Sequence, residues 1–174
     1  MSRDMEIEVS VDKSEVLDEV GRLTAYTGQR KEGDAGVYER ISSTSGDADM
    51  LEQFWQASCS AMSDNLKPFI KELRYDYETY EYSSSNINVN PAPISVSHTG
   101  YYVKLELSGS YDTSLTGSMM ESMKNFFICM MSSKWFKITS HDDAQSYADD
   151  AAGYMTDIMR KIYFKKKPSR RPSL

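Results

Sequence analysis

The spacing of apolar residues changes twice along this chain, and these changes constrain its fold more than any other feature of the sequence. In residues 48–66, apolar side chains recur every three or four positions, at Leu51, Trp55, Cys59, Met62 and Leu66. That is the period of one face of an α-helix. In residues 73–82 and 101–107 the apolar and aromatic residues mostly alternate with polar ones, as in a half-exposed strand. Helical spacing returns after residue 112, so the sequence predicts two strands inserted between helices.

Four helices are expected, near residues 12–26, 48–72, 113–136 and 141–163. Asp12 and Glu15 form a start signal for the first helix, because a side-chain oxygen can accept a hydrogen bond from a free amide of the first turn. Pro68 should bend or end the second helix. The third is apolar on nearly every side, which is typical of a central helix. We expect it to pack on the fourth through Met119, Met123, Phe127, Ala148, Ala151 and Met155.

The two strands are expected to form a long antiparallel hairpin over about residues 73–108, with a mobile tip at 83–93. The alternation changes parity between Tyr77 and Tyr80, which predicts a bulge near Thr79. Residues 6–11 also alternate and predict a short strand or an extended arm. The predicted fold is therefore mainly α with a long β-hairpin (α+β), in which the hairpin is inserted between the second and third helices of a four-helix core.

Residues 75–82 of this hairpin combine tyrosines with acids and contain no basic residue. One interpretation is a half-exposed edge strand whose acids prevent edge-to-edge aggregation. The other is an interface strand, in which the tyrosines bury area at low entropic cost and the acids select a basic partner. Under the second interpretation the candidate interface residues are Tyr75, Tyr77, Tyr80, Tyr82 and, on the second strand, Tyr101.

The charge of the chain is divided between an acidic body and a basic end. From Met159 onward there are 7 of the 20 basic residues and no acid, which leaves a net charge of −13 on residues 1–158. We expect a single domain over residues 1–164 and an extended basic tail over 165–174. Such a tail can bind the acidic body of another copy or touch nucleic acid. Its candidate interface residues are Tyr163, Phe164, Lys165, Lys166, Lys167, Arg170 and Arg171.

The sequence contains no recognisable catalytic constellation, and we expect neither an enzyme nor a bound cofactor or metal. The two histidines, His98 and His141, lack the partners that a zinc site needs. Cys59 and Cys129 fall among apolar residues of expected helices and are interpreted as free buried thiols. The longest apolar run, residues 126–131, has six residues against the roughly 20 that span a bilayer, so no membrane segment is expected. The N-terminal residues 1–8 do not resemble a secretory signal.

Three short patterns occur in an order that resembles a known family. The first runs from Val9 through Val11, Asp12 and Glu15 to Leu17. The second is the acid-capped segment Asp47-Ala48-Asp49-Met50-Leu51, followed by Trp55, Ala57 and Ala61. The third begins with Asp112-Thr113-Ser114-Leu115 and ends at the aromatic Trp135. Over residues 6–164 this order of elements resembles the head–tail connector (adaptor) proteins of tailed bacteriophages.

The resemblance implies a structural virion protein that forms a ring, expected to be a dodecamer, in the phage neck. Such a ring joins the portal of the head to the tail, contacts the portal and other neck or tail proteins, and lines the DNA channel without sequence-specific binding. It would be assembled in the cytoplasm of the bacterial host. An acidic body suits such a channel, because it repels phosphate. Two alternatives stay open: a tail-completion or tail-terminator protein, built mainly from sheet, and a small nucleic-acid-binding accessory protein that uses the basic tail.

Overall fold

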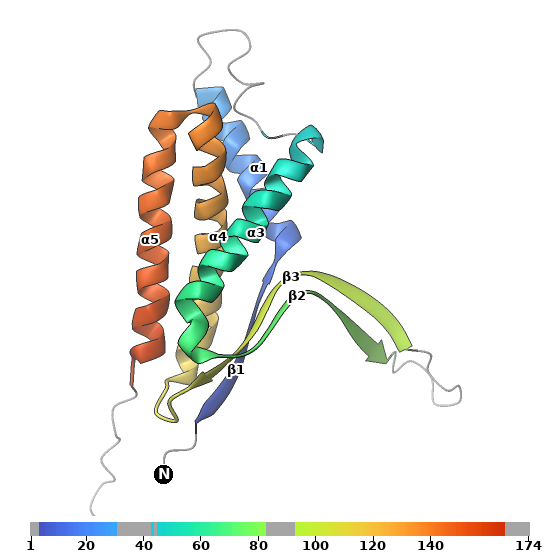
Figure 1. Ribbon diagram of the computed structural model, residues 1–174, viewed down its shortest axis with the longest axis vertical. Helices are drawn as coiled ribbons and strands as arrows, with labels where there is room; N and C mark the ends of the chain where they lie inside the picture. Colours follow the sequence, from blue (N-terminus) through green and yellow to red (C-terminus); the bar gives the residue numbers. More distant parts are fainter. Residues whose placement is uncertain (1–3, 31–42, 44, 83–92, 166–174) are drawn as a thin grey trace, which may run out of the picture.

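The computed structural model describes residues 4–30, 43, 45–82 and 93–165 (Figure 1). It is mostly helical, with a small antiparallel sheet, and so confirms the expected mixture of helix and strand. Its strands and α-helices are, in order, β1 (Met5–Asp12), α1 (Lys13–Arg30), α3 (Ala48–Leu66), β2 (Ile70–Tyr82), β3 (Pro93–Leu107), α4 (Thr116–Thr139) and α5 (His141–Tyr163). Short 3₁₀ turns precede α3, β2 and α4: η1 (Ser45–Asp47), η2 (Lys67–Phe69) and η3 (Thr113–Leu115).

Helix α1 begins where the sequence predicted. The carboxylate of Asp12 accepts a hydrogen bond from the backbone N–H of Glu15 at 3.1 Å and from the hydroxyl of Ser14 at 2.5 Å. These bonds satisfy donors of the first turn that have no partner within the helix. Val16 and Val20 then bury one face of the helix against the core.

Helix α3 ends earlier than expected. The sequence predicted a helix over 48–72, but the α-helix stops at Leu66 and Pro68 lies within η2. The proline ring prevents the helical hydrogen bonding from continuing, and the backbone at Ile70 is already extended, with φ −72° and ψ 119°. The chain therefore enters β2 three residues before the predicted start of the hairpin at residue 73.

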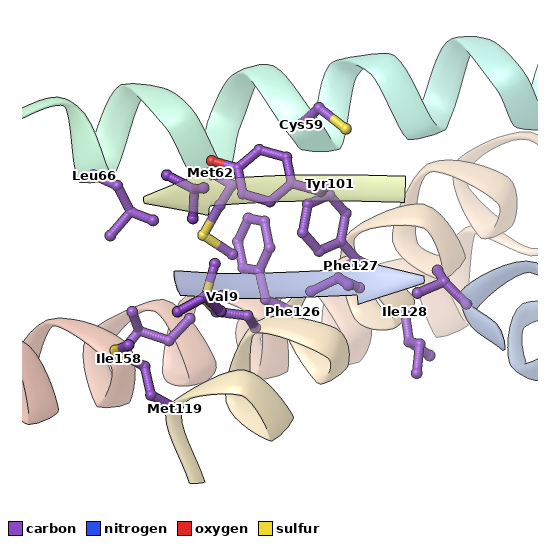
Figure 2. Packing of buried hydrophobic residues seen from close by; sticks show 14 of the residues in the cluster. Val9, Cys59, Met62, Leu66, Tyr101, Met119, Phe126, Phe127, Ile128 and Ile158 are labelled. Atoms are coloured by element: carbon purple, nitrogen blue, oxygen red, sulfur yellow. The ribbon is translucent and has the colours of Figure 1, made fainter. Parts of the chain in front are cut away.

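Helix α4 is the central helix, as its composition predicted. It packs against α5, α3, α1 and β1, and buried residues lie on nearly all of its sides. The predicted packing of α4 on α5 is present. Phe127 also points toward α3 and the sheet: its ring lies 4.8 Å from that of Trp55 and 5.3 Å from that of Tyr101. Figure 2 shows Phe127 and Tyr101 in the core between α3, the sheet and α4.

The sheet has three strands in the order β1-β3-β2, with both pairs antiparallel. The N-terminal segment is thus a strand rather than a free arm, and it pairs with β3 from Met5↔Leu107 to Asp12↔Gly100. In the described part of β3, the residues that precede Gly100 pair with β2 alone, from Tyr77↔His98 to Tyr82↔Pro93. In Figure 1 this two-stranded ribbon extends away from the helices. We call residues 77–82 and 93–98 the hairpin arm.

The bulge predicted near Thr79 is not there, because pairing is continuous from Tyr77 to Tyr82. The register instead shifts between Ile70 and Glu72 and between Tyr75 and Tyr77. At the second shift the extra residue belongs to β3, near Gly100. A Cβ atom on Gly100 would lie 2.4 Å from the carbonyl oxygen of Val11. The close approach of β1 to β3 therefore requires glycine at this position.

Candidate protein-interaction surface

Two of the predicted interface tyrosines meet on the inner face of the sheet, at its junction with α3. The rings of Tyr75 and Tyr101 lie 5.8 Å apart, and both hydroxyl groups reach the Ser63 hydroxyl, at 3.0 and 3.1 Å. Tyr75 keeps 39% of its surface exposed, so it remains available to a partner. It lies at the base of the hairpin arm.

Tyr101 was expected at an interface, and that expectation is wrong. Its side chain is fully buried between Tyr75 and Phe127, and burial raises the pKa of its phenol well above the ordinary value. Tyr101 has the same orientation on β3 as Val103 and Leu105, and β3 is the central strand, covered by helices on that face. It is a core residue that also satisfies its hydroxyl through Ser63.

For the other hairpin tyrosines, the structure describes the position of the backbone only. Tyr77, Tyr80 and Tyr82 lie in the arm and pair with His98, Ser95 and Pro93 of β3. Their side chains, and the predicted mobile tip at 83–93 apart from Pro93, lie outside the described part of the structure. The arm is thus placed as a backbone ribbon, and the role of its tyrosines stays a prediction.

At the end of α5 the aromatic pair predicted to anchor the tail is exposed. Tyr163 and Phe164 have 64% and 50% of their surface accessible. The ring of Tyr163 contacts Phe69 edge-on, with centroids 5.6 Å apart, and so lies beside the start of β2. Lys165 is exposed and forms an isolated β-bridge with Tyr111. Lys166, Lys167, Arg170 and Arg171 lie outside the described residues.

The outer face of the sheet is a network of ion pairs. Lys71 of β2 pairs with Glu6 of β1, and Lys104 of β3 pairs with Glu8 at 3.0 Å. The hydrogen bond from Lys71 is the main reason that the pKa of Glu6 lies below its ordinary value, and Lys104 acts in the same way on Glu8. The alternation of residues 6–11 indicated the strand, but no local signal indicated which lysines would face its acids.

The sequence did not indicate a groove that lies between three helices. It has a volume of about 350 Å³ and lies between α3, α4 and α5. Alanines and larger apolar residues form most of its lining: Ala61, Phe126, Met130, Ala148, Ala151, Ala152 and Met155. Lys134 and Lys137 of α4 contribute charge to one side. We call this the α3–α4–α5 groove. Ala148 and Ala151 of α5 were expected to pack against α4, and their short side chains also leave this hollow.

Ser122, Asp157 and Lys161 form a polar cluster between α4 and α5. The Ser122 hydroxyl donates to Asp157 at 2.7 Å, and the Lys161 ammonium donates to Ser122 at 2.7 Å and pairs with Asp157 at 2.5 Å. A serine nucleophile needs a neighbouring base that can take its proton. Here the serine donates to a carboxylate that is already paired with the lysine, so the cluster ties the two helices together.

Cys59 and Cys129 are both buried, as expected, and no disulfide joins them. His141 is exposed, whereas the side chain of His98 lies outside the described residues. Within residues 4–30, 45–82 and 93–165, no group of three His, Cys, Asp or Glu side chains is arranged to hold a metal ion. None of the helices in the described part of the chain is long and apolar enough to cross a membrane.

No protein-family model, curated protein sequence or solved structure matches this chain.

Proposed function

We propose that this chain is a structural protein of a tailed-phage virion, a subunit of a neck ring that joins the portal of the head to the tail. The observation that carries the proposal is the hairpin arm. Six residue pairs of β2 and β3 continue beyond the end of β1 as a two-stranded ribbon. A two-stranded hairpin is at best marginally stable in water by itself. An arm of this kind gains its stability when a partner subunit covers it.

The composition of the arm agrees with this role. Tyrosine is enriched at protein interfaces, where it buries a large area with few rotatable bonds. Tyr77, Tyr80 and Tyr82 supply three such side chains within one strand. Tyr75 at the base of the arm and Tyr163 beside the start of β2 add exposed aromatic surface on the body.

The order of elements supports the connector over one of its alternatives. A four-helix core with a hairpin inserted between the second and third helices agrees with the resemblance to head–tail connector proteins. The additional strand β1 completes a small sheet but leaves the chain mostly helical. A tail-completion or tail-terminator protein would be built mainly from sheet, so the helical content weighs against that alternative.

The charge distribution suits a ring around DNA. The surface between α1 and α4 carries Glu15, Asp18, Glu19 and Glu121, against Arg22 and Lys124. If a surface of this kind lines the channel, it repels phosphate and lets DNA pass without adhesion. The basic tail then binds a neighbouring copy or another neck protein, because it is attracted to the acidic residues of that surface.

The proposal is tested by the mass and shape of the protein in solution. Static light scattering over a range of concentrations, with negative-stain electron microscopy, should reveal a closed ring whose formation requires the arm. The matched variant replaces residues 77–98 with Asn-Gly, which favours a tight hairpin turn and leaves Tyr75 and Tyr101 in place. It should keep the helical circular dichroism and lose the ring.

Two results would contradict the proposal. The full chain could stay monomeric at all concentrations, both alone and with the portal protein from the same phage. It could also bind DNA with strong salt dependence through its tail while forming no ring. The second result would support the nucleic-acid-binding accessory protein instead.

A further inference from the structure

The α3–α4–α5 groove has two properties of a docking site. Its lining is mostly apolar, with alanines of α3 and α5 beside Phe126, Met130 and Met155. Its charged residues are both lysines of α4, Lys134 and Lys137, and no acid is part of the lining. An apolar recess with charge of one sign at its side favours an occupant that combines aromatic groups with acids.

The two lysines differ from most other lysines of the body. Lys13, Lys71, Lys104, Lys124 and Lys161 each form an ion pair with an acid of the same chain. Within the described residues, neither Lys134 nor Lys137 has such a partner. Because the rest of the body is rich in acids, two lysines that have no acidic partner among the described residues leave a local site for negative charge beside the apolar groove.

We infer that the occupant of this groove is the hairpin arm of a second copy of the chain. Residues 76–82 have the complementary composition: Tyr77, Tyr80 and Tyr82 alternate with Asp76, Glu78 and Glu81, and no basic residue is present. Because pairing is continuous from Tyr77 to Tyr82, Glu78, Tyr80 and Tyr82 fall on the same face of the strand. In the docked arm, Tyr80 and Tyr82 fill the recess and Glu78 pairs with Lys134 and Lys137. The inference rests on the proposed function, since it names the contact through which neighbouring subunits of the ring bind each other.

Neither of the other segments of this chain fits as well. The arm of the same copy extends away from the helices in Figure 1 and so does not lie over its own groove. The tail, residues 165–174, contains five basic residues and no acid, so Lys134 and Lys137 repel it. A head-to-tail contact, in which the arm of one copy enters the groove of the next, is also the type of interface that generates a ring.

Charge reversal tests the contact in the full-length chain. The variant Lys134→Glu/Lys137→Glu should weaken assembly by about tenfold or more, because it places like charges together. The control Lys67→Glu/Arg160→Glu changes the net charge equally, at exposed basic residues outside the groove lining, and should assemble like the wild type. Adding Glu78→Lys to the groove variant should restore part of the assembly.

Disulfide trapping then tests which segments meet. Two single variants, Ala152→Cys in the groove and Tyr80→Cys in the arm, are mixed in equal amounts and oxidised. A disulfide between the two different variants is expected. The native thiols should not interfere, because both are buried and burial raises the pKa of Cys129 to about 11.

The outcomes separate this inference from the proposed function. If the wild type forms a ring, the groove variant assembles equally well and no mixed disulfide forms, the inference is wrong and the ring proposal stands. If the wild type forms no ring, the proposed function fails first. If the groove variant assembles normally but no longer binds the portal or a tail protein, the groove belongs to that protein and the inference is overturned.

Discussion

The ammonium of Lys161 donates a hydrogen bond to the hydroxyl of Ser122 across the interface between α5 and α4, at 2.7 Å. The Ser122 hydroxyl donates in turn to the carboxylate of Asp157, and Lys161 also donates to the backbone carbonyl of Ser118 at 3.0 Å. The last turns of α5 are thereby fixed to the first turns of α4, immediately before the chain leaves the helices as the basic tail.

Replacing Ser122 by alanine should lower the free energy of unfolding by about 1–2 kcal/mol, since it removes one hydrogen bond from Asp157 and one acceptor from Lys161. Urea denaturation monitored by circular dichroism measures the change. The control is Thr156→Ala on the exposed side of α5, where the hydroxyl bonds only to the backbone of its own helix. An equal loss of unfolding free energy in both variants would mean that the hydrogen bonds between α4 and α5 do not stabilise the fold.

The same cluster should make stability depend on pH in the acid range. The hydrogen bond from Lys161, followed by that from Ser122, holds the pKa of Asp157 below its ordinary value of 3.8. A lowered pKa in the folded state contributes stability that is complete above the unfolded value and is lost as pH falls through the folded value. The difference in unfolding free energy between wild type and Asp157→Asn should therefore shrink below about pH 4. If the difference in unfolding free energy grew as the pH fell, the lowered pKa of Asp157 would not be its cause.

Gly100→Ala should destabilise the fold by about 3 kcal/mol, at the upper end of the usual cost of overpacking. The new Cβ would lie 2.4 Å from the carbonyl oxygen of Val11, a backbone atom that cannot turn aside. Gly153→Ala is the matched control, because no heavy atom outside the adjacent backbone of α5 lies within 4 Å of its Cβ position. This second change should leave stability equal or raise it by about 0.5–1 kcal/mol. Thermal unfolding of both variants gives the comparison.

Phe127→Ala should lower the free energy of unfolding by about 3–5 kcal/mol, because it opens a cavity between Trp55 and Tyr101. Tyr163→Ala removes a ring that is mostly exposed and should have little effect on chemical denaturation. Similar losses of unfolding free energy in the two variants would show that Phe127 does not stabilise the core more than an exposed ring does.

Ending the chain after Lys165 should leave the melting temperature nearly unchanged, since it preserves the bridge to Tyr111. It should weaken ring assembly, more at low salt than at high salt, because salt screens the attraction between the basic tail and the acidic body. Light scattering at two ionic strengths measures this. Undiminished assembly would show that the tail has no docking role, and loss of DNA binding alone would favour the accessory-protein alternative.

The sequence predicted the features that depend on neighbouring residues. Helical periodicity located the four α-helices of the described residues, and the capping signal at Asp12 located the start of the first. The end of α3 was missed because a proline after a helical stripe is compatible with either a kink or a stop. Tyr101 shares its parity with Val103 and Leu105, so the pattern did hold a signal that it is buried.

The remaining features depend on residues that are distant in the sequence. The pairing of β1 with β3 and the register shift at Gly100 follow from the approach of residues about ninety positions apart. The α3–α4–α5 groove arises only where three helices converge, and its lysines are recognisable only by contrast with the paired lysines elsewhere. No local pattern contains that information.

The sheet register has a consequence for how the chain can vary. In the described part of β3, the residues from Gly100 onward pair with β1 and belong to the core. Residues 93–98, which precede Gly100, belong to the arm. Residue pairs can therefore be added to or removed from the arm without repacking a buried side chain of the body. The body sets the stability of the subunit, while the length of the arm sets how far it can reach. Natural variants of this protein should tolerate length changes between residues 77 and 98 far better than at any site within β1 or α4.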